Sequence, residues 1–196
     1  MGRAALYSDD TILDAALELV AADGPQGATV VAIAARLGAP SGSIYHRFAS
    51  RDLLLARLWI RTVERFQEGY LDVLALTDPV EATRAAVDFV LEWGGEHRHE
   101  AQLLTMYRRT DLVALWPDRL GEQLATLNSR VEEGLQGFAR RRFGDVSAQT
   151  MDLARFAVID VPYGAARQAI RDGRPPSPWL REAVARAAQA ALDVQD

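Results

Sequence analysis

The chain has 196 residues, and 49% of them are hydrophobic, which is enough for one large domain or two small domains with a sizeable core. It contains no cysteine, which excludes disulfides and thiolate metal sites and agrees with a reducing cytoplasm. The formal net charge is −5, so the overall charge does not point to a nucleic-acid binder.

The N-terminal sequence and the hydropathy pattern show no sign of export or membrane insertion. Residues 1–14 lack the long apolar stretch of a secretory signal, and Asp9 and Asp10 would interrupt one. No run approaches the ~18 consecutive apolar residues that a membrane-spanning helix needs. We therefore expect a soluble, cytoplasmic protein with no membrane partner.

Apolar residues recur with helical spacing almost throughout, and no alternating strand pattern appears, which predicts an all-α fold of about nine helices. A first helix follows the N-cap Ser8 and stops at Gly24-Pro25. A second helix covers residues 30–37, between the N-cap Thr29 and the terminating glycine Gly38.

The next two helices differ strongly in length. A third, short helix is predicted over about residues 41–48, and Ser50 caps a long fourth helix with buried positions as far as Leu71. Because the helices are short up to this point and long beyond it, the pattern predicts a small head, residues 1–50. A larger helical body, residues 51–196, follows it.

Glycine and proline breaks divide the body into further helices. Pro162 is expected to kink the helix in which it lies, because proline removes one backbone hydrogen bond. The expected helices are one that begins at Pro79 and ends near Gly94-Gly95, a short one around residues 103–107, and longer ones over about residues 118–143, 147–171 and 179–194.

A helix, a turn centred on residues 38–40 and a short helix form the outline of a helix-turn-helix, whose second helix enters the major groove of DNA. Small residues with hydrogen-bonding groups allow close approach to the base edges, while Tyr and Arg side chains and helix N-caps suit phosphates. The predicted DNA-binding residues are Thr29, Ser41, Gly42, Ser43, Tyr45, His46, Arg47, Ser50 and Arg51. Ile44 and Phe48 are interpreted as core, and Tyr45 could equally be a half-buried surface aromatic.

The run GAPSGSIYHRFASRDLLLARL, residues 38–58, resembles the signature of the TetR family of bacterial transcriptional repressors. That signature has a turn glycine, small and basic residues, Leu-Tyr, His or Tyr, an aromatic position, Phe, and a Lys-Glu-x-Leu start to the next helix. The matching positions are Gly38, Ile44-Tyr45, His46, Phe48 and Arg51-Asp52-Leu53. The resemblance covers about residues 10–57.

Three positions depart from the family pattern. The family often has Ser or Thr at the place of Pro40, a basic residue at Ser41 and an aromatic residue at Arg47. These departures shift the expected contacts, so no base preference is carried over from the family.

The resemblance implies that residues 1–50 are a DNA-binding domain and that residues 51–196 bind a ligand and form a homodimer through the last two helices. The sequence agrees, because the helix over residues 147–171 is apolar on most faces and the last helix is rich in small Ala residues. The predicted interface comprises Phe156, Ile159, Trp179, Ala183, Val184, Ala187 and Ala191. An intramolecular core is the alternative interpretation of the same residues.

The resemblance also implies an effector pocket between the fourth and eighth helices, and aromatic and Met side chains make adaptable pocket walls. The candidates are Trp59, Phe66, Phe89, Trp93, Met106, Tyr107, Trp116, Phe138, Phe156 and Tyr163. Each of them could instead be an ordinary core residue.

The segment Glu96 to Glu100 contains two histidines, but His97 and His99 point to nearly opposite sides of a helix and make a poor metal pair. Glu96 and His99 share a face, so a metal or acidic-ligand role is a minor alternative to a solvated helix start. We predict no metal and no cofactor.

The main hypothesis is a ligand-responsive DNA-binding transcriptional regulator, a repressor that a small-molecule inducer releases from its double-stranded operator. One alternative is a helical small-molecule-binding or interaction protein without DNA binding, since residues 1–65 hold seven arginines and seven acids. Another alternative is an enzyme that uses a helical cavity, although no nucleophile–base arrangement and no catalytic residue can be read from the sequence.

Overall fold

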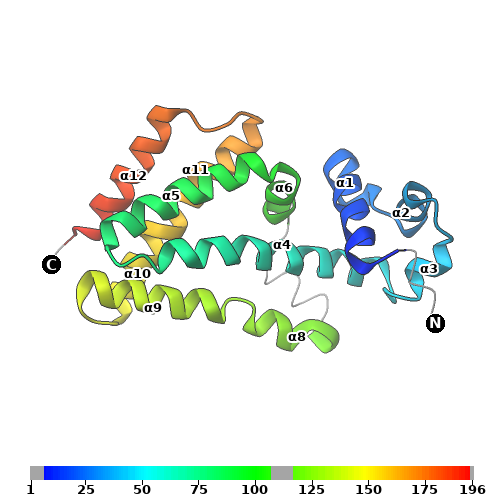
Figure 1. Cartoon of the computed structure of the whole chain (residues 1–196), viewed down its shortest axis with the longest axis horizontal. Helices are drawn as coiled ribbons and strands as arrows, with labels where there is room; N and C mark the ends of the chain where they lie inside the picture. The colour runs from blue at the N-terminus through cyan, green and yellow to red at the C-terminus, as the bar shows by residue number, and fades with distance from the viewer. Residues whose placement is uncertain (1–6, 107–116, 195–196) are drawn as a thin grey trace. The chain divides into compact units, whose positions relative to one another are not determined.

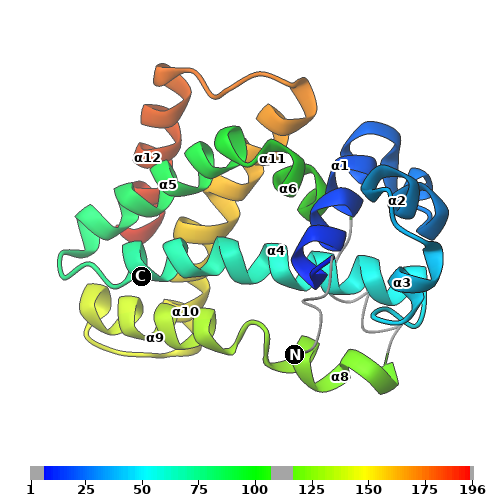
Figure 2. The same cartoon turned by 45° about the vertical axis from the view of Figure 1, so that its right-hand side comes forward.

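The computed structural model describes residues 7–106 and 117–194, and within these ranges every regular element is a helix (Figures 1 and 2). The chain divides into two compact units, one formed by residues up to 63 together with 102–124, the other by residues 64–101 together with 125–196. None of the described helices is both long and apolar enough to cross a membrane.

The first unit contains α1 (Asp9–Gly27), α2 (Val30–Leu37), α3 (Ser41–Tyr45) and the first half of α4 (Arg51–Leu74). All three predicted N-caps act at helix starts: Ser8 Oγ accepts from the Thr11 N–H, Thr29 Oγ1 from the Ala32 N–H and Ser50 Oγ from the Leu53 N–H, each at 3.1 Å. These caps set where α1, α2 and α4 begin.

The ends of the first three helices agree with the prediction for α2 and differ slightly from it for α1 and α3. Gly24 has φ +73°, which interrupts α1 where the sequence placed its end, but one more helical turn continues to Gly27. Gly38 has φ +63° and ends α2, as predicted, because only glycine adopts this left-handed conformation readily. The third helix ends at Tyr45 and not at Phe48, although Phe48 remains buried.

Apolar side chains from all four helices meet in the core of the first unit. Ile12 of α1, Ile33 of α2, Ile44 of α3 and Leu54 of α4 have no exposed surface. Phe48, between α3 and α4, is also buried. Ile44 and Phe48 therefore are core residues, as the sequence indicated, and they fix α3 by one side only.

The second unit is built around α5 (Pro79–Glu96), which packs against both α11 (Val161–Asp172) and α12 (Pro178–Leu192). Figure 1 shows these three helices side by side. The other described elements are α6 (Arg98–Met106), α8 (Pro117–Thr126), α9 (Ser129–Phe143), α10 (Ala148–Arg155) and the π-helical turn η1 (Phe156–Asp160). The core of this unit includes Tyr70, Val87, Leu91 and Phe138.

The helix predicted over residues 118–143 is broken into α8 and α9. The break falls at Leu127 and Asn128, where the Asn128 backbone leaves the helical region. Asn128 Oδ1 instead accepts a hydrogen bond from Gln67 Nε2 at 3.1 Å. This bond holds the Asn128 side chain against α4, away from the start of α9.

The helix predicted over residues 147–171 is continuous but contains the turn η1, in which the Val161 N–H bonds to the Phe156 carbonyl. Pro162 follows, and its missing N–H leaves the Val158 carbonyl without its usual partner in the helix. The Tyr70 hydroxyl of α4 donates to that carbonyl at 2.7 Å. The predicted disturbance at Pro162 is thus a π turn whose free carbonyl is satisfied from another helix.

The prediction of an all-α fold is confirmed. If α8 with α9, and α10 with η1 and α11, are each counted as one interrupted helix, the described elements number nine, as the sequence indicated.

Candidate functional site

Helices α2 and α3 meet at a tight turn that holds α3 on the surface of the first unit. Gly38 and Ala39 donate to the Ala35 and Ala34 carbonyls at 3.2 and 2.9 Å, which closes the end of α2. The Tyr7 hydroxyl donates to the Gly38 carbonyl at 3.2 Å and ties the start of the described chain to the same turn. The orientation of α3 is therefore set by backbone bonds on one side and by Ile44 on the other.

The outer side of α3 presents small and polar groups. Gly42 is exposed, and a Cβ added there would meet nothing within 4 Å. Ser41 and Ser43 are half-buried, whereas Tyr45 is 54% exposed and His46 is exposed. Of the nine predicted DNA-binding residues, these five lie together on one short, accessible helix end.

Thr29 and Ser50 lie at the starts of the helices that flank α3. Ser50 Oγ accepts from the Leu53 N–H at 3.1 Å, which matches the role of Thr29 at the start of α2. Each oxygen accepts in this bond, so each hydroxyl hydrogen can still be donated outward to an anionic oxygen. Both residues are exposed.

Arg51, by contrast, serves the structure of the first unit. Its Nε donates to the Ala28 carbonyl at 3.0 Å, Nη2 donates to the Pro25 carbonyl, and Nη1 pairs with Asp52 at 3.1 Å. Arg51 therefore braces the connection between α1 and α2 from the start of α4. Sequence reasoning missed this role, because the two carbonyls that it binds become close only in the fold.

Other arginines of the first unit are also engaged by partners inside the unit. The pairs are Arg36 with Glu18, Arg47 with Asp9, and Arg61 with Asp10 and Asp14 at 3.0 and 2.7 Å. The acidic side of every pair comes from α1. The side chains that α3 exposes are thus mainly uncharged, and this explains how residues 1–65, with seven arginines and seven acids, can still offer a polar surface.

The predicted effector residues are distributed over several environments. Phe66 stacks on Tyr70 at 5.4 Å between ring centroids and meets Phe89 and Trp93 at 5.5 and 5.1 Å. Phe138 is fully buried in the same core. These residues form a packed aromatic cluster, in which Gly69 is required because a Cβ there would lie 2.6 Å from Phe89 Cε2.

The other predicted effector residues do not join this cluster. Trp59 is buried in the first unit, while Met106, Phe156 and Tyr163 are exposed. Tyr107 and Trp116 lie outside the described residues.

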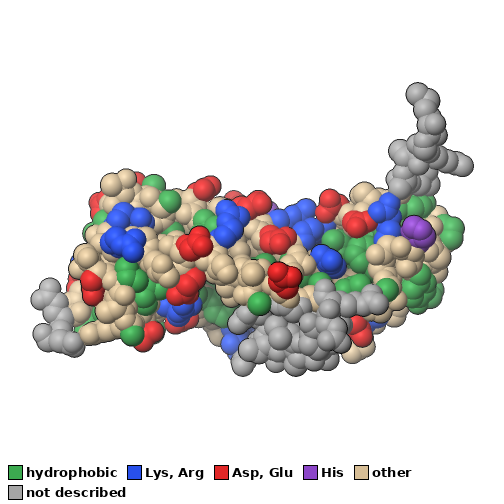
Figure 3. All heavy atoms as spheres, turned by 90° about the horizontal axis from the view of Figure 1, so that it is seen from below, with side chains coloured by type: hydrophobic (Ala, Val, Ile, Leu, Met, Phe, Trp, Pro, Cys, Tyr) green, Lys and Arg blue, Asp and Glu red, His purple; other side chains and the backbone are tan. Residues whose placement is uncertain are grey.

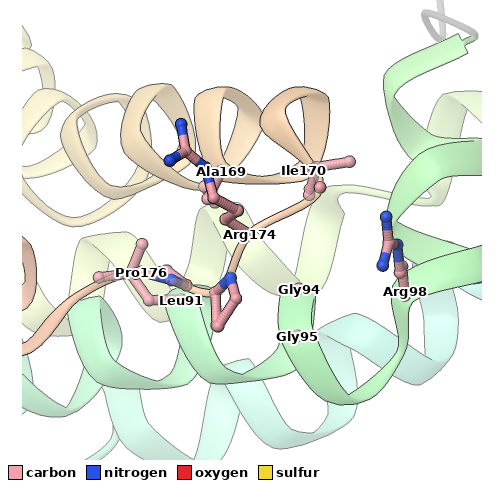
Figure 4. Close-up of a pocket in the computed structure, with 11 residues that line it drawn as sticks. Leu91, Gly94, Gly95, Arg98, Ala169, Ile170, Arg174 and Pro176 are labelled. Carbon is pink, nitrogen blue, oxygen red and sulfur yellow. The ribbon is translucent and has the colours of Figure 1, made fainter.

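A cavity of about 200 Å³ lies elsewhere in the second unit, between α5, the start of α6, α11 and the connection from α11 to α12. Leu91, Gly94 and Ile170 line its apolar side (Figure 4). Arg98 and Arg174 stand on opposite sides of it in Figure 4, and among the described residues neither has a carboxylate partner. The sequence signal at this cavity is the pair Gly94-Gly95, which by itself predicts only the end of a helix.

Two residues of the segment with two histidines, His97 and Glu100, make structural contacts, whereas Glu96 and His99 are exposed. His97 stacks on Trp93, and its Nδ1 lies 2.9 Å from Glu100 Oε2, while Arg65 pairs with Glu100 Oε1 at 3.1 Å. Glu100 is only 8% exposed, and these two partners compensate its buried charge. Within residues 7–106 and 117–194 no cluster of His, Asp or Glu could hold a metal ion.

Large aromatic side chains are exposed on the helices predicted to form an interface. Trp179 is 72% exposed, Phe156 52% and Tyr163 43%. Ala183 and Ala187 are also exposed, and Ile159 and Ala191 are half-buried. Val184 is instead buried in the core of its own chain, where it packs with the α5 residues. Figure 3 shows one face of the molecule, on which apolar, acidic and basic side chains are interspersed.

The arrangement of α2, the Gly38 turn and the exposed α3 defines a helix-turn-helix DNA-binding protein. Residues 12–58 match the family model described as bacterial regulatory proteins, tetR family. Residues 12–58 therefore carry the DNA-binding segment that is typical of TetR-type transcriptional regulators.

Solved structures share the whole fold. A TetR family regulator, PfmR from Thermus thermophilus, is 24% identical with a TM-score of 0.66, covering 94% of this chain and 98% of that one. A transcriptional regulator from Rhodococcus sp. Rha1 is 22% identical with a TM-score of 0.74, covering 96% and 100%. The fatty acid degradation regulator FadR from Bacillus halodurans is 18% identical with a TM-score of 0.71, covering 94% of each chain. A search of curated proteins gave no match.

Proposed function

We propose that this regulator is a cytoplasmic homodimeric repressor that a small-molecule effector releases from its operator. The observation that carries the proposal is the group of exposed aromatic side chains, Phe156, Tyr163 and Trp179, on helices that follow a helix-turn-helix head in the chain. Large apolar side chains exposed on helices that pack together mark a candidate interaction surface. A second copy of the chain, related by a two-fold axis, would cover them.

In this proposal residues 1–50 bind DNA, and residues 51–196 bind the effector and form the dimer. Two heads on a two-fold axis would occupy successive major grooves, with half-sites about 34–36 Å apart or somewhat more. The groups that α3 exposes would read base edges, and Thr29 and Ser50 would donate to phosphates.

The effector would act by favouring a conformation in which the two heads no longer match the half-sites. Binding of effector and of DNA would then oppose each other with a reciprocal coupling free energy, commonly ~1–3 kcal/mol. The helix α4 is the proposed lever, because it starts directly after the reading segment and its far end packs in the core of the body.

Two regions of the body are candidates for the effector site. One is the aromatic cluster of Phe66, Phe89 and Trp93, which would have to open to admit a ligand. The other is the cavity beside Gly94 and Ile170, which is already open and about 200 Å³ in volume.

A thermal-shift screen over apolar, cationic and acyl compounds tests the proposal. Acyl compounds are included because FadR, which shares the fold, is a regulator of fatty acid degradation. A ligand present at 100 times its dissociation constant should add ~2.7 kcal/mol to the free energy of unfolding. The same compound should release the protein from DNA in a gel-shift assay, and a stabilising compound that leaves DNA binding unchanged would contradict the repressor mechanism.

The variant Gly95→Leu distinguishes the two candidate sites. A Cβ at Gly95 meets nothing within 4 Å, so the substitution should leave the unliganded melting temperature at or above that of the wild type. The longer side chain would reduce the space beside α5. If the effector shift is the same in this variant, the cavity is not the effector site and the aromatic cluster is favoured.

A further inference from the structure

Arg47 stands where the chain leaves α3, and its guanidinium is turned back onto α1. The Arg47 N–H bonds to the Ile44 carbonyl at 3.0 Å, so the residue continues the last turn of α3. Its Nη1 forms an ion pair with the carboxylate of Asp9 in the first turn of α1. The Arg47 side chain is 29% exposed, which leaves the guanidinium within reach of an incoming phosphate.

The ion pair matters because the head has few other positive charges to offer DNA. Arg36 and Arg61 are paired with acids of α1, and Arg51 is bound to backbone carbonyls and to Asp52. Non-specific affinity for DNA comes almost entirely from arginines and lysines that neutralise phosphates. Arg47 is the arginine nearest along the chain to the exposed residues of α3.

We propose that Asp9 is a specificity-determining residue, which holds Arg47 away from the phosphates and so weakens binding to DNA of arbitrary sequence. The Asp9 carboxylate and a phosphate oxygen compete for the same guanidinium. On DNA where α3 makes no good base contacts, Arg47 would exchange Asp9 for a phosphate with little gain in free energy. The exchange would also leave the Asp9 carboxylate unpaired close to the DNA backbone. On the operator, the contacts of Tyr45 and His46 compensate for that loss, so the ratio of specific to non-specific affinity rises.

This proposal rests on the DNA-reading role of α3, and the variant Asp9→Asn tests it. Binding to a duplex of random sequence is measured by fluorescence anisotropy between 50 and 200 mM salt. Each added phosphate contact steepens the slope of log K against log salt by about 0.9. Each Arg47 released from Asp9 should therefore make the loss of affinity between 50 and 200 mM salt about 3.5-fold larger. We expect the variant to bind the random duplex more tightly at 50 mM salt and with this steeper slope.

The matched control is Asp10→Asn. It removes the same charge from the same first turn of α1, but the partner of Asp10 is Arg61 on α4, which keeps Asp14 as a second partner at 2.7 Å. The control therefore frees no guanidinium and should leave the salt slope unchanged. The double variant Asp9→Asn with Arg47→Ala should also lack the gain.

An operator duplex selected from a randomised pool with the wild-type protein completes the test. The ratio of operator to random affinity should fall in Asp9→Asn and stay near that of the wild type in Asp10→Asn. The role of Asp9 would be overturned if both Asn variants gained the same affinity for the random duplex, or if the gain persisted without Arg47. Weaker binding of the random duplex by Asp9→Asn would also overturn it. A wild-type protein that binds neither duplex would contradict the DNA-reading role itself.

Discussion

Two residues that the sequence placed together at the DNA, Tyr45 and Arg51, have different positions in the structure. Tyr45 is 54% exposed, and the described residues show no bond that its hydroxyl makes, whereas Arg51 connects α4 with two carbonyls between α1 and α2. We expect Tyr45→Ala to weaken operator binding by about 1–3 kcal/mol with no change in melting temperature.

Arg51→Ala should instead lower the free energy of unfolding by about 1–3 kcal/mol, because two buried-side carbonyls lose a charged donor. Chemical denaturation followed by circular dichroism, next to gel-shift affinity, separates the two effects. If the Arg51→Ala protein kept its stability but bound DNA more weakly, the result would favour the DNA-binding role that the sequence predicts for Arg51.

Tyr70 is the second residue whose role is visible only in the fold. Burial raises the pKa of its hydroxyl above the usual range, and the nearby charge of Asp160 adds to this. Because the folded protein holds this proton more tightly than the unfolded chain, the contribution to stability is complete below the ordinary pKa of about 10 and declines as pH rises above it.

Tyr70→Phe leaves the Val158 carbonyl without a donor, so we expect a loss of about 1–3 kcal/mol at pH 7. The loss relative to the wild type should shrink as pH rises beyond 10, since the phenylalanine variant has no proton to release there. Urea denaturation at a series of pH values measures both. A difference between the two proteins that grows with pH would contradict the assignment.

At the scale of the elements, Pro162, η1 and Tyr70 are linked through the Val158 carbonyl. The proline removes an N–H, the helix adjusts by a π turn, and α4 supplies the missing donor. Pro162→Ala would restore an N–H that competes for the Val158 carbonyl. In a double-mutant cycle we therefore expect Tyr70→Phe to cost at least 0.5 kcal/mol less in the Pro162→Ala background. Additive effects would mean that the proline and the tyrosine are independent.

The elements also show which features could be predicted. The helix starts at Ser8, Thr29 and Ser50 and the end at Gly38 depend on the residue itself and its near neighbours, and all four were found from sequence. The break at Asn128 depends on Gln67, a partner 61 positions away, and was not predicted. Helix ends that depend on neighbouring residues can be predicted from one sequence, whereas contacts between residues that only the fold brings together cannot.

In the candidate site, too, the local features could be predicted and the contacts between distant residues could not. The exposed residues of α3 were identified because Ile44 and Phe48 define which side of a short helix is buried. The pairing of Arg47 with Asp9 was not, since a charged side chain gives no sequence signal of the acid it will meet. The cavity beside Gly94 was also missed, because space in a fold depends on how several helices pack.

At the scale of the whole molecule, the proposal of a homodimer makes a direct prediction. Trp179 is 72% exposed at the start of α12, and an aromatic side chain of this size at the centre of an interface commonly contributes ≥2 kcal/mol. Trp179→Glu should therefore raise the dimer dissociation constant by a factor of about 30 or more. Sedimentation equilibrium measures this constant, with Val80→Glu as control, an exposed apolar residue at the start of α5. An interface at Trp179 would be contradicted if both variants raised the dissociation constant equally, or if neither variant raised it.

The bond from Tyr70 to the Val158 carbonyl also has a mechanical consequence. A hydrogen bond of 2.7 Å loses most of its strength once donor and acceptor separate by about 1 Å. Sliding α4 along its axis would therefore break this bond early in the movement. The bond thus helps to fix the register of the far end of α4 against the helix that contains Val158.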